Sequence, residues 1–357
     1  MPDVLLFGAS GYTGRLTAHA LARRQIDFTI AGRDRAKLES LASEVGDPEI
    51  KIASVGDVDS LAAALDDVRV MISCVGPFLD LGDTAIEAAL KARVNYLDST
   101  GEGPFIKELA ASCSERARSA GIAMVPSMGF DEVPGDVAAT IAATGLDDAE
   151  VTMTYAVPTT PSAGTARTVP SILAAAGYFI EDGRRVEVGI GERRRWSPMP
   201  APLGPRPAAS FPLSLLEVVP LHLDLRSLGT YVTISSAQRM ALKATLPLLR
   251  ASLAIGPIER MIKNVAGRVP GPRRDARAKR WTILAEARGS NGFRNVVVQG
   301  ADVYGLTAET LAAGAARMAQ ADFERSGVLA PVQAMDLDFL QKELVNQGIT
   351  IETHDPS

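Results

Sequence analysis

Cysteine, histidine and tryptophan are scarce in this sequence. Its 357 residues include 2 cysteines, 3 histidines and 2 tryptophans. Cys74 and Cys113 are too few for a disulfide framework, and their spacing with His19, His222 and His354 resembles no metal-ligand pattern. We therefore expect no metal site, and the cysteine usage fits a reducing compartment such as the cytoplasm.

Long hydrophobic runs and excess positive charge are also absent. No uncharged run approaches the roughly 18 residues that suggest a membrane-spanning helix, and Met1 leads into the apolar run Val4–Phe7 without a basic and apolar leader. The 37 Lys and Arg against 42 Asp and Glu give a net charge of −5, which repels nucleic-acid phosphates. The sequence predicts a cytoplasmic protein without a transmembrane segment or a nucleic-acid partner.

What is present is the composition of an ordinary globular protein. Hydrophobic residues make up 46% and charged residues 22% of the chain. At about 150 residues per domain, this length favours two domains, each large enough to bury a core.

Short β-branched apolar runs alternate with longer amphipathic patterns through the first 125 residues. This alternation is typical of an α/β fold with a Rossmann-type doubly wound parallel sheet. Strands are expected at Val4–Phe7, Phe28–Ala31, Ile50–Ala53, Val70–Ser73, Asn95–Leu97 and Ile122–Val125. Helices are expected at Thr13–Arg24, Arg35–Glu44, Asp83–Lys91 and Pro104–Ala120.

The pattern changes after Pro126, where a second, α+β domain is expected. The proline-rich residues 198–212 favour an ordered loop. Further strands, in a mixed or antiparallel sheet, are expected at Glu150–Val157, Thr230–Ser236, Trp281–Arg288 and Asn295–Asp302. Further helices are expected at Val137–Ala143, Thr307–Arg325 and Asp336–Asn346. We place one domain at 1–128, completed by the C-terminal helices of 305–357, and the other at 129–304.

A glycine-rich turn lies between the first predicted strand and the first predicted helix. Gly8 permits a tight turn, Gly11 lets the backbone approach a pyrophosphate, and Gly14 lets the helix pack closely on the sheet. The helix N-terminus adds N–H donors and a positive dipole end. A glycine turn without a ligand is the alternative to dinucleotide binding. The predicted contacts are Gly8, Ser10, Gly11, Tyr12, Thr13 and Gly14.

The end of the second strand bears on the choice between NAD and NADP. An acidic residue there would bind the ribose 2′-hydroxyl of NAD, whereas Arg33 can pair with the 2′-phosphate of NADP. Arg35 and Lys37 add positive charge. Alternatively, Asp34 caps the next helix and Arg33 is solvated, and both interpretations can hold together. The sequence predicts NADP, with Arg33 and Lys37 as contacts.

Four stretches resemble the saccharopine dehydrogenase-like family, which includes trans-acting enoyl reductases and saccharopine dehydrogenase-like oxidoreductases. They are residues 8–14, 73–78, 96–102 and 129–136, with a weaker fifth stretch at 162–166. The resemblance implies an NADP-binding Rossmann domain joined to a substrate domain. Glu132 and Gly135 stand where relatives often carry Ser, and Ala163 where Gly is common, so details of the pocket are open.

Residues that follow parallel strands face the ligand crevice in such folds. After the fourth strand, Gly76 would admit the nicotinamide ribose, Pro77 would hold the turn rigid, and Phe78 would wall the ring, with Val75 beside them. The family resemblance supports this assignment over an apolar crossover without ligand contact.

A second family shares the glycine loop, namely the N-acetyl-glutamyl-phosphate reductases, which use a cysteine nucleophile at the start of a helix. Cys74 instead ends a predicted buried strand, and Cys113 lies inside a predicted helix. Thiol catalysis is therefore not expected here.

Two acidic clusters follow the fifth and sixth strands and are expected to converge near the crevice. Hydride transfer must be matched by a proton, so a carboxylate is the natural candidate donor. Asp131 is the first choice, ahead of Asp98 and Glu102, although Asp131 can also cap the following helix. The clusters comprise Tyr96, Asp98, Glu102, Asp131, Glu132 and Asp136.

Three other features have open interpretations. Arg167 can clamp a substrate oxygen or be an ordinary surface residue, and the basic residues within 268–280 favour a solvated loop. The apolar stretches 211–225 and 246–262 fit an apolar substrate pocket, a subunit interface or core. A homodimer is expected by analogy only.

Together these features predict an NADP(H)-dependent oxidoreductase that acts on a C=C or C=N bond of a small organic substrate. The apolar stretches favour an enoyl reductase. The alternative is a non-catalytic NADP-binding sensor or scaffold, since no obvious acid-base residue is present.

Overall fold

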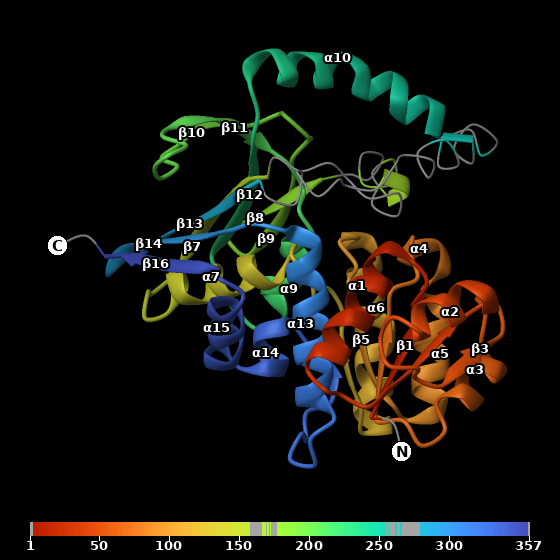
Figure 1. Cartoon of the computed structure of the whole chain (residues 1–357). Coiled ribbons are helices and arrows are strands. Elements are labelled where there is room, and N and C mark those ends of the chain that lie inside the picture. Colours follow the sequence, from red (N-terminus) through yellow and green to blue (C-terminus); the bar gives the residue numbers. More distant parts are fainter. Residues whose placement is uncertain are drawn as a thin grey trace. The chain divides into compact units, whose positions relative to one another are not determined.

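The computed structural model describes residues 3–157, 166–168, 170, 172, 177–253, 256, 261–262, 265 and 279–355. The chain divides into two compact units (Figure 1). Unit 1 comprises Met1–Val133 and Val303–Glu343, and unit 2 comprises Pro134–Asp302 and Leu344–Ser357. The assignment of all of 305–357 to the first domain was therefore wrong for residues 344–357. These residues include strand β16 (Thr350–His354), which pairs with β14 (Gly292–Gly300) of unit 2.

Unit 1 contains a seven-stranded sheet in the order β15-β6-β5-β4-β1-β2-β3, and every pairing is parallel. The chain order reverses on either side of β1, which makes the β1/β4 boundary a topological switch point. This confirms the predicted fold class. The strands are β1 (Val4–Phe7), β2 (Phe28–Gly32), β3 (Ile50–Ile52), β4 (Val70–Ser73), β5 (Asn95–Asp98), β6 (Ala123–Val125) and β15 (Gly327–Val328).

The predicted helices of unit 1 are present, with three short additions, α3, α4 and α14. Gly121, with φ +72°, ends α6, because a left-handed residue terminates the hydrogen-bond pattern. The helices are α1 (Tyr12–Arg23), α2 (Arg35–Ala42), α3 (Val58–Ala64), α4 (Phe78–Leu81), α5 (Asp83–Ala92), α6 (Gly103–Ala120), α13 (Val303–Met318), α14 (Pro331–Met335) and α15 (Leu337–Asn346).

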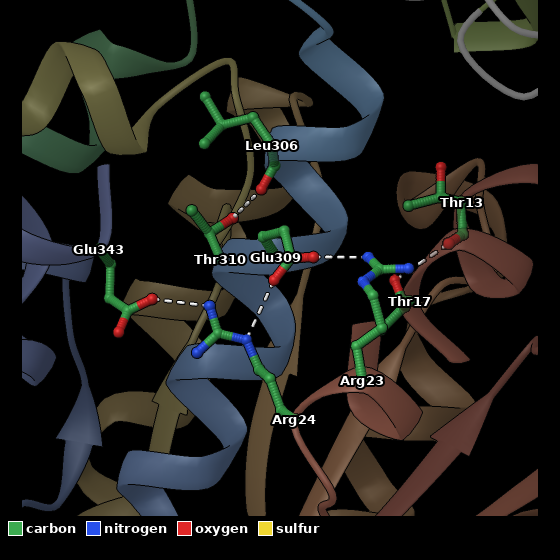
Figure 2. Close-up of polar contacts among 8 residues, drawn as sticks. All are labelled: Thr13, Thr17, Arg23, Arg24, Leu306, Glu309, Thr310 and Glu343. Carbon is green, nitrogen blue, oxygen red and sulfur yellow. Dashed lines mark hydrogen bonds and ion pairs between the residues drawn. The ribbon is translucent and has the colours of Figure 1, made fainter. Parts of the chain in front are cut away.

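An ion-pair network ties helix α1 to the C-terminal helices of unit 1 (Figure 2). Arg24 Nε donates to Glu309 of α13 at 3.0 Å, and Arg24 Nη2 donates to Glu343 of α15 at 2.7 Å. Arg23 donates to the other oxygen of Glu309 at 2.5 Å, but its side chain is 62% exposed against 25% for Arg24. The half-buried Arg24 therefore joins segments more than 280 positions apart in the sequence.

Unit 2 contains a mixed sheet in the order β10-β11-β12-β7-β13-β14-β16, in which β8 also pairs with β12, and β9 pairs with β8. Only the β12–β7 pairing among these described strands is parallel. The strands are β7 (Glu150–Ala156), β8 (Tyr178–Glu181), β9 (Arg184–Glu187), β10 (Arg194–Ser197), β11 (Arg206–Ser210), β12 (Ser227–Thr233), β13 (Trp281–Gly289), β14 and β16. The helices are α7 (Val133–Ala143), α9 (Leu215–Val218), the 3-10 turn Val219–Leu221 and α10 (Ser236–Leu253).

Two sequence interpretations change in unit 2. The proline-rich segment 198–212 is not all loop, because β11 within it pairs with β10 and β12. Within the apolar stretch 211–225, Leu215, Leu216 and Val218 are fully buried or nearly so, which makes this part of the stretch core. None of the helices in the described part of the chain is both long and apolar enough to cross a membrane.

Candidate functional site

The glycine loop is packed too tightly for any larger residue at two of its positions. Gly8 has φ +80°, and a Cβ there would lie 2.6 Å from Val75 Cγ2. A Cβ on Gly14 would lie 2.3 Å from the Gly8 carbonyl oxygen and 2.8 Å from Ala9 Cα. The loop therefore lies against both the start of α1 and the residues that follow β4.

The loop also leaves the N-terminus of α1 without a side-chain cap. Gly11 is the N-cap residue, and it has no side chain to accept a bond from the first helical N–H groups. A twelve-residue helix whose positive end opens onto a glycine turn at a switch point fits a pyrophosphate. These residues accordingly fit the dinucleotide that the sequence predicts.

The residues that follow β2 lie beside this loop. A Cβ on Gly32 would lie 4.0 Å from Ser10 Oγ, so the two loops are neighbours. Arg33 is exposed and forms no ion pair with any residue that the structure describes. Asp34 accepts a bond from the Lys37 N–H at 3.2 Å and pairs with Lys37 Nζ at 3.0 Å. Arg33 is therefore available to a 2′-phosphate, whereas Lys37 is already neutralised.

The ion pair also explains the acidity of Asp34. The side-chain hydrogen bond from Lys37, with the Lys37 N–H and the nearby positive charges, lowers the pKa of the Asp34 carboxyl. The capping role that the sequence offered as an alternative is thus present. It leaves Asp34 poorly placed to compete for a ribose hydroxyl.

The segment after β4 is held in place by a buried carboxylate. Glu102, only 3% exposed, accepts from the Phe78 N–H at 2.6 Å and from the Leu79 N–H at 3.2 Å. Its own N–H donates to Thr100 Oγ1 at 3.1 Å. Glu102 therefore acts as a latch on the first turn of α4, a role that the sequence did not suggest.

The segment 75–78, which Glu102 holds in place, is partly core and partly accessible. Phe78 is buried, and its ring lies 5.7 Å from that of Phe105 and covers one side of Gly76. Val75 and Gly76 remain half-buried beside the glycine loop. Of the four predicted contacts here, Val75 and Gly76 are thus the accessible ones, and Phe78 supports them from behind.

Asp98 is fully buried, and its carboxylate, like that of Glu102, binds backbone N–H groups of neighbouring loops. Its Oδ1 accepts from the N–H groups of Thr100 at 2.8 Å and Ser127 at 2.9 Å, and its Oδ2 accepts from Tyr96 at 2.8 Å. Burial raises the pKa of this carboxyl to about 6, although the three hydrogen bonds counter it. Asp98 therefore joins the loops after β5 and β6.

Asp131 differs from these two carboxylates. It lies in the turn before α7, its side chain has solvent access, and its carboxylate packs against Gly101, where a Cβ would lie 2.8 Å from Oδ2. Desolvation by the surrounding protein raises its pKa to about 6. The loops that carry Glu102 and Asp131 therefore meet, as the sequence predicted for the two acidic clusters.

Not every member of the second cluster joins them. Glu132 is buried, and Asp136 belongs to unit 2, where its Oδ1 lies 2.6 Å from Nε2 of His222. Sequence reasoning missed this pair, because 86 positions separate the two residues. The described residues contain no group of three or more potential metal ligands.

Helix α13 contributes residues that sequence reasoning also missed. The Tyr304 ring meets the Tyr12 ring edge-on at 5.1 Å, next to the glycine loop. Thr307 Oγ1 accepts from the Phe130 N–H at 3.0 Å, and Thr310 Oγ1 donates to the Met128 carbonyl at 2.9 Å. These hydroxyls fix the loop that carries Asp131.

The remaining candidates carry little chemistry. Burial raises the pKa of Cys74 to about 12, so its thiol stays protonated, and Cys113 is buried in α6. Arg167 is exposed, whereas residues 162–165 and most of the basic segment 268–280 lie outside the described residues. The structure thus supports the rejection of thiol catalysis.

Comparison with known proteins agrees with this geometry. Residues 4–125 match the saccharopine dehydrogenase NADP binding domain. A human saccharopine dehydrogenase-like oxidoreductase is 30% identical over 155 residues, which cover 38% of this chain and 35% of that protein. A Mycobacterium tuberculosis protein, provisionally named a trans-acting enoyl reductase, is 30% identical over 141 residues, which cover 38% and 34%. The match thus spans about a third of these relatives.

A solved structure extends the likeness of fold to the whole chain. Apo saccharopine dehydrogenase (L-Glu forming) from Saccharomyces cerevisiae covers 100% of both chains with a TM-score of 0.65 at 15% identity. The glycine loop and the switch point both lie within residues 4–125, the part of the chain that matches the saccharopine dehydrogenase NADP binding domain.

Proposed function

We propose that the protein is an NADP(H)-dependent oxidoreductase that transfers hydride to or from a C=C or C=N bond of a small organic substrate. The observation that carries this proposal is the glycine loop, which lies against Val75 and also beside Gly32, the last residue of β2 and the neighbour of Arg33. A dinucleotide bound there has donors for its pyrophosphate and a cation for its 2′-phosphate. When bound, the nicotinamide supplies or accepts the hydride.

The chain's own residues hold and position this cofactor. The first turn of α1 binds the pyrophosphate through its N–H groups, and Arg33 pairs with the 2′-phosphate. Val75 and Gly76 border the position of the nicotinamide ribose, and the Glu102 latch fixes their backbone. The segment beside the nicotinamide ribose is thus fixed by hydrogen bonds within the chain.

The proton that accompanies the hydride is assigned to Asp131. Asp98 and Glu102 are buried and already accept backbone N–H bonds, so donating a proton would break the ties that position the loops. Asp131 has solvent access, and its pKa of about 6 leaves a fraction of it protonated near neutral pH. It can therefore deliver a proton to the atom of the double bond that does not receive the hydride, and regain one from water.

Of the two bond types, we favour C=C, as in an enoyl substrate. The relative named as an enoyl reductase is 30% identical to this chain over 141 residues, whereas the saccharopine dehydrogenase shares its fold at 15% identity. Following NADPH absorbance with enoyl thioesters, and separately with glutamate and an aldehyde, distinguishes C=C from C=N reduction. Oxidation of NADPH by neither substrate class would argue against both bond assignments.

A non-catalytic NADP sensor or scaffold is the second candidate. The observation that favours it is that Asp98 and Glu102 are buried and bind backbone N–H groups. Asp131 is therefore the one predicted acid with solvent access. Steady NADPH turnover with any substrate would exclude it. Fluorescence titration that showed no binding of NADPH at millimolar concentration would refute both candidates.

A further inference from the structure

Unit 2 has a surface cavity of about 430 Å³ that the proposed oxidoreductase site does not use. Its walls come from the edge strand β10, from β11 and from the start of α10. The lining residues are Arg194, Arg195, Trp196, Pro207, Ala208, Ile234, Ser236 and Arg239. This volume lies within the range of pockets that bind small molecules.

Positive charge dominates this lining. It includes three arginines and no acidic residue, although the whole chain has a net charge of −5. Arg195 is compensated by Glu286 at 2.6 Å. Arg194 forms no ion pair with any described residue, and the contact of Arg239 with the Gly191 carbonyl, at 3.5 Å, is long for a hydrogen bond. Two guanidinium groups are thus left for an anion.

An aromatic surface accompanies the charge. The Trp196 side chain is 70% exposed, whereas the chain's other tryptophan, Trp281, is 1% exposed. An indole left in water beside arginines offers a stacking surface for a planar ring. Guanidinium groups pair bidentately with phosphate, and several together suit a dianion better than a single carboxylate.

We propose that this cavity binds a small organic phosphate with an aromatic ring, of the nucleoside monophosphate class. Arg194 and Arg239 pair with the phosphate, and Trp196 stacks on the ring. The site lies within unit 2, so it is separate from the glycine loop of unit 1. It does not depend on the proposed oxidoreductase activity.

The two tryptophans make a direct test possible. Adenosine monophosphate is titrated into the full chain with saturating NADP⁺ present, and tryptophan emission is excited at the red edge of its absorption. Because Trp281 is buried, saturable quenching reports on Trp196. Calorimetry of Trp196→Phe, which keeps a ring, measures binding without the indole signal.

Arg194→Gln is expected to weaken adenosine monophosphate at least about tenfold, as the loss of one charge-assisted pair implies, and Arg194→Lys should recover part of that loss. Arg184→Gln is the matched control, because Arg184 is an exposed arginine on β9 outside the cavity. Adenosine and inorganic phosphate should each bind more weakly than the complete nucleotide.

Three results would overturn the proposal. One is the absence of saturable quenching at millimolar nucleotide. Another is an equal loss of affinity in Arg194→Gln and Arg184→Gln. The third is a dimer in sedimentation that buries Trp196 and dissociates in Trp196→Ala, which would make the face a subunit interface.

Discussion

Replacement of Glu102 by Gln tests whether the carboxylate after β5 positions the cofactor loop. Glutamine retains one acceptor oxygen but brings an NH₂ group against one of the two N–H donors, Phe78 or Leu79. Hydrogen bonds to charged groups contribute about 1.5–3 kcal/mol and neutral ones about 0.5–1.5 kcal/mol, and an unsatisfied buried donor costs about 1–3 kcal/mol. We therefore expect a local destabilisation of about 2–3 kcal/mol.

The expected signature is local to one end of the cofactor. Amide hydrogen exchange at Phe78 and Leu79 should accelerate about 30- to 150-fold, which corresponds to that free energy. NADPH should bind more weakly, whereas 2′-phosphoadenosine 5′-diphosphate, which lacks the nicotinamide, should bind as before. The exposed Glu108 on α6 provides the control variant Glu108→Gln.

Three outcomes would contradict the latch. Unchanged exchange at Phe78 and Leu79 would mean that the two N–H groups do not depend on the Glu102 charge. Equal weakening of NADPH and of the fragment would mean that the substitution disturbs the whole domain. A loss of turnover with unchanged exchange and affinity would instead return Glu102 to the role of proton donor.

Four further predictions follow from the same contacts. Arg33→Ala should weaken NADPH about 10- to 150-fold in fluorescence titration and leave NADH unchanged, and equal losses would make Arg33 structural. Asp131→Asn should lower kcat about 10²- to 10⁴-fold without altering NADPH affinity, and should abolish the decline in reduction rate above pH 6 that follows from its raised pKa. Arg24→Gln should lower the free energy of unfolding, measured in urea, by about 1.5–3 kcal/mol, because the half-buried Glu309 and Glu343 lose this partner. Arg23 is more exposed, so Arg23→Gln should lower it by under about 1 kcal/mol. Burial raises the pKa of Asp98 to about 6 in the folded state, so the folded protein loses stability as the pH rises from about 4 to 6 and this proton is lost. Asp98→Asn should therefore gain stability relative to wild type over that pH range, and a constant difference would contradict the shift.

The fold of unit 1 is largely predictable because its signals are local. Strands β1, β2 and β4 are short, fully buried and mostly apolar runs, and Gly8, Gly11 and Gly14 mark the first turn by their spacing alone. In unit 2 the local signal fails at particular places. Helix α10 contains Pro247, which argues against a helix in any sequence-based reading, and β8 to β11 are four or five residues long.

The partners of the site residues are less predictable than their positions. Sequence order places Asp98, Glu102 and Asp131 after parallel strands, but it does not tell which carboxylate accepts backbone N–H bonds. That depends on contacts such as Phe130 with Thr307, which are 177 positions apart. Similarly, the pairing of Asp136 with His222 and of Arg24 with Glu309 has no local signature.

These partners decide how three similar carboxylates divide their roles. A carboxylate that accepts two backbone N–H bonds holds a loop in place, and its use as a proton donor would disturb that loop. Asp98, the last residue of β5, and Glu102, which accepts bonds from the first turn of α4, both meet that description. Asp131 instead lies in the turn before α7, where its side chain has solvent access. The same sheet edge can therefore hold the cofactor loops rigid with two acids and exchange protons with the third.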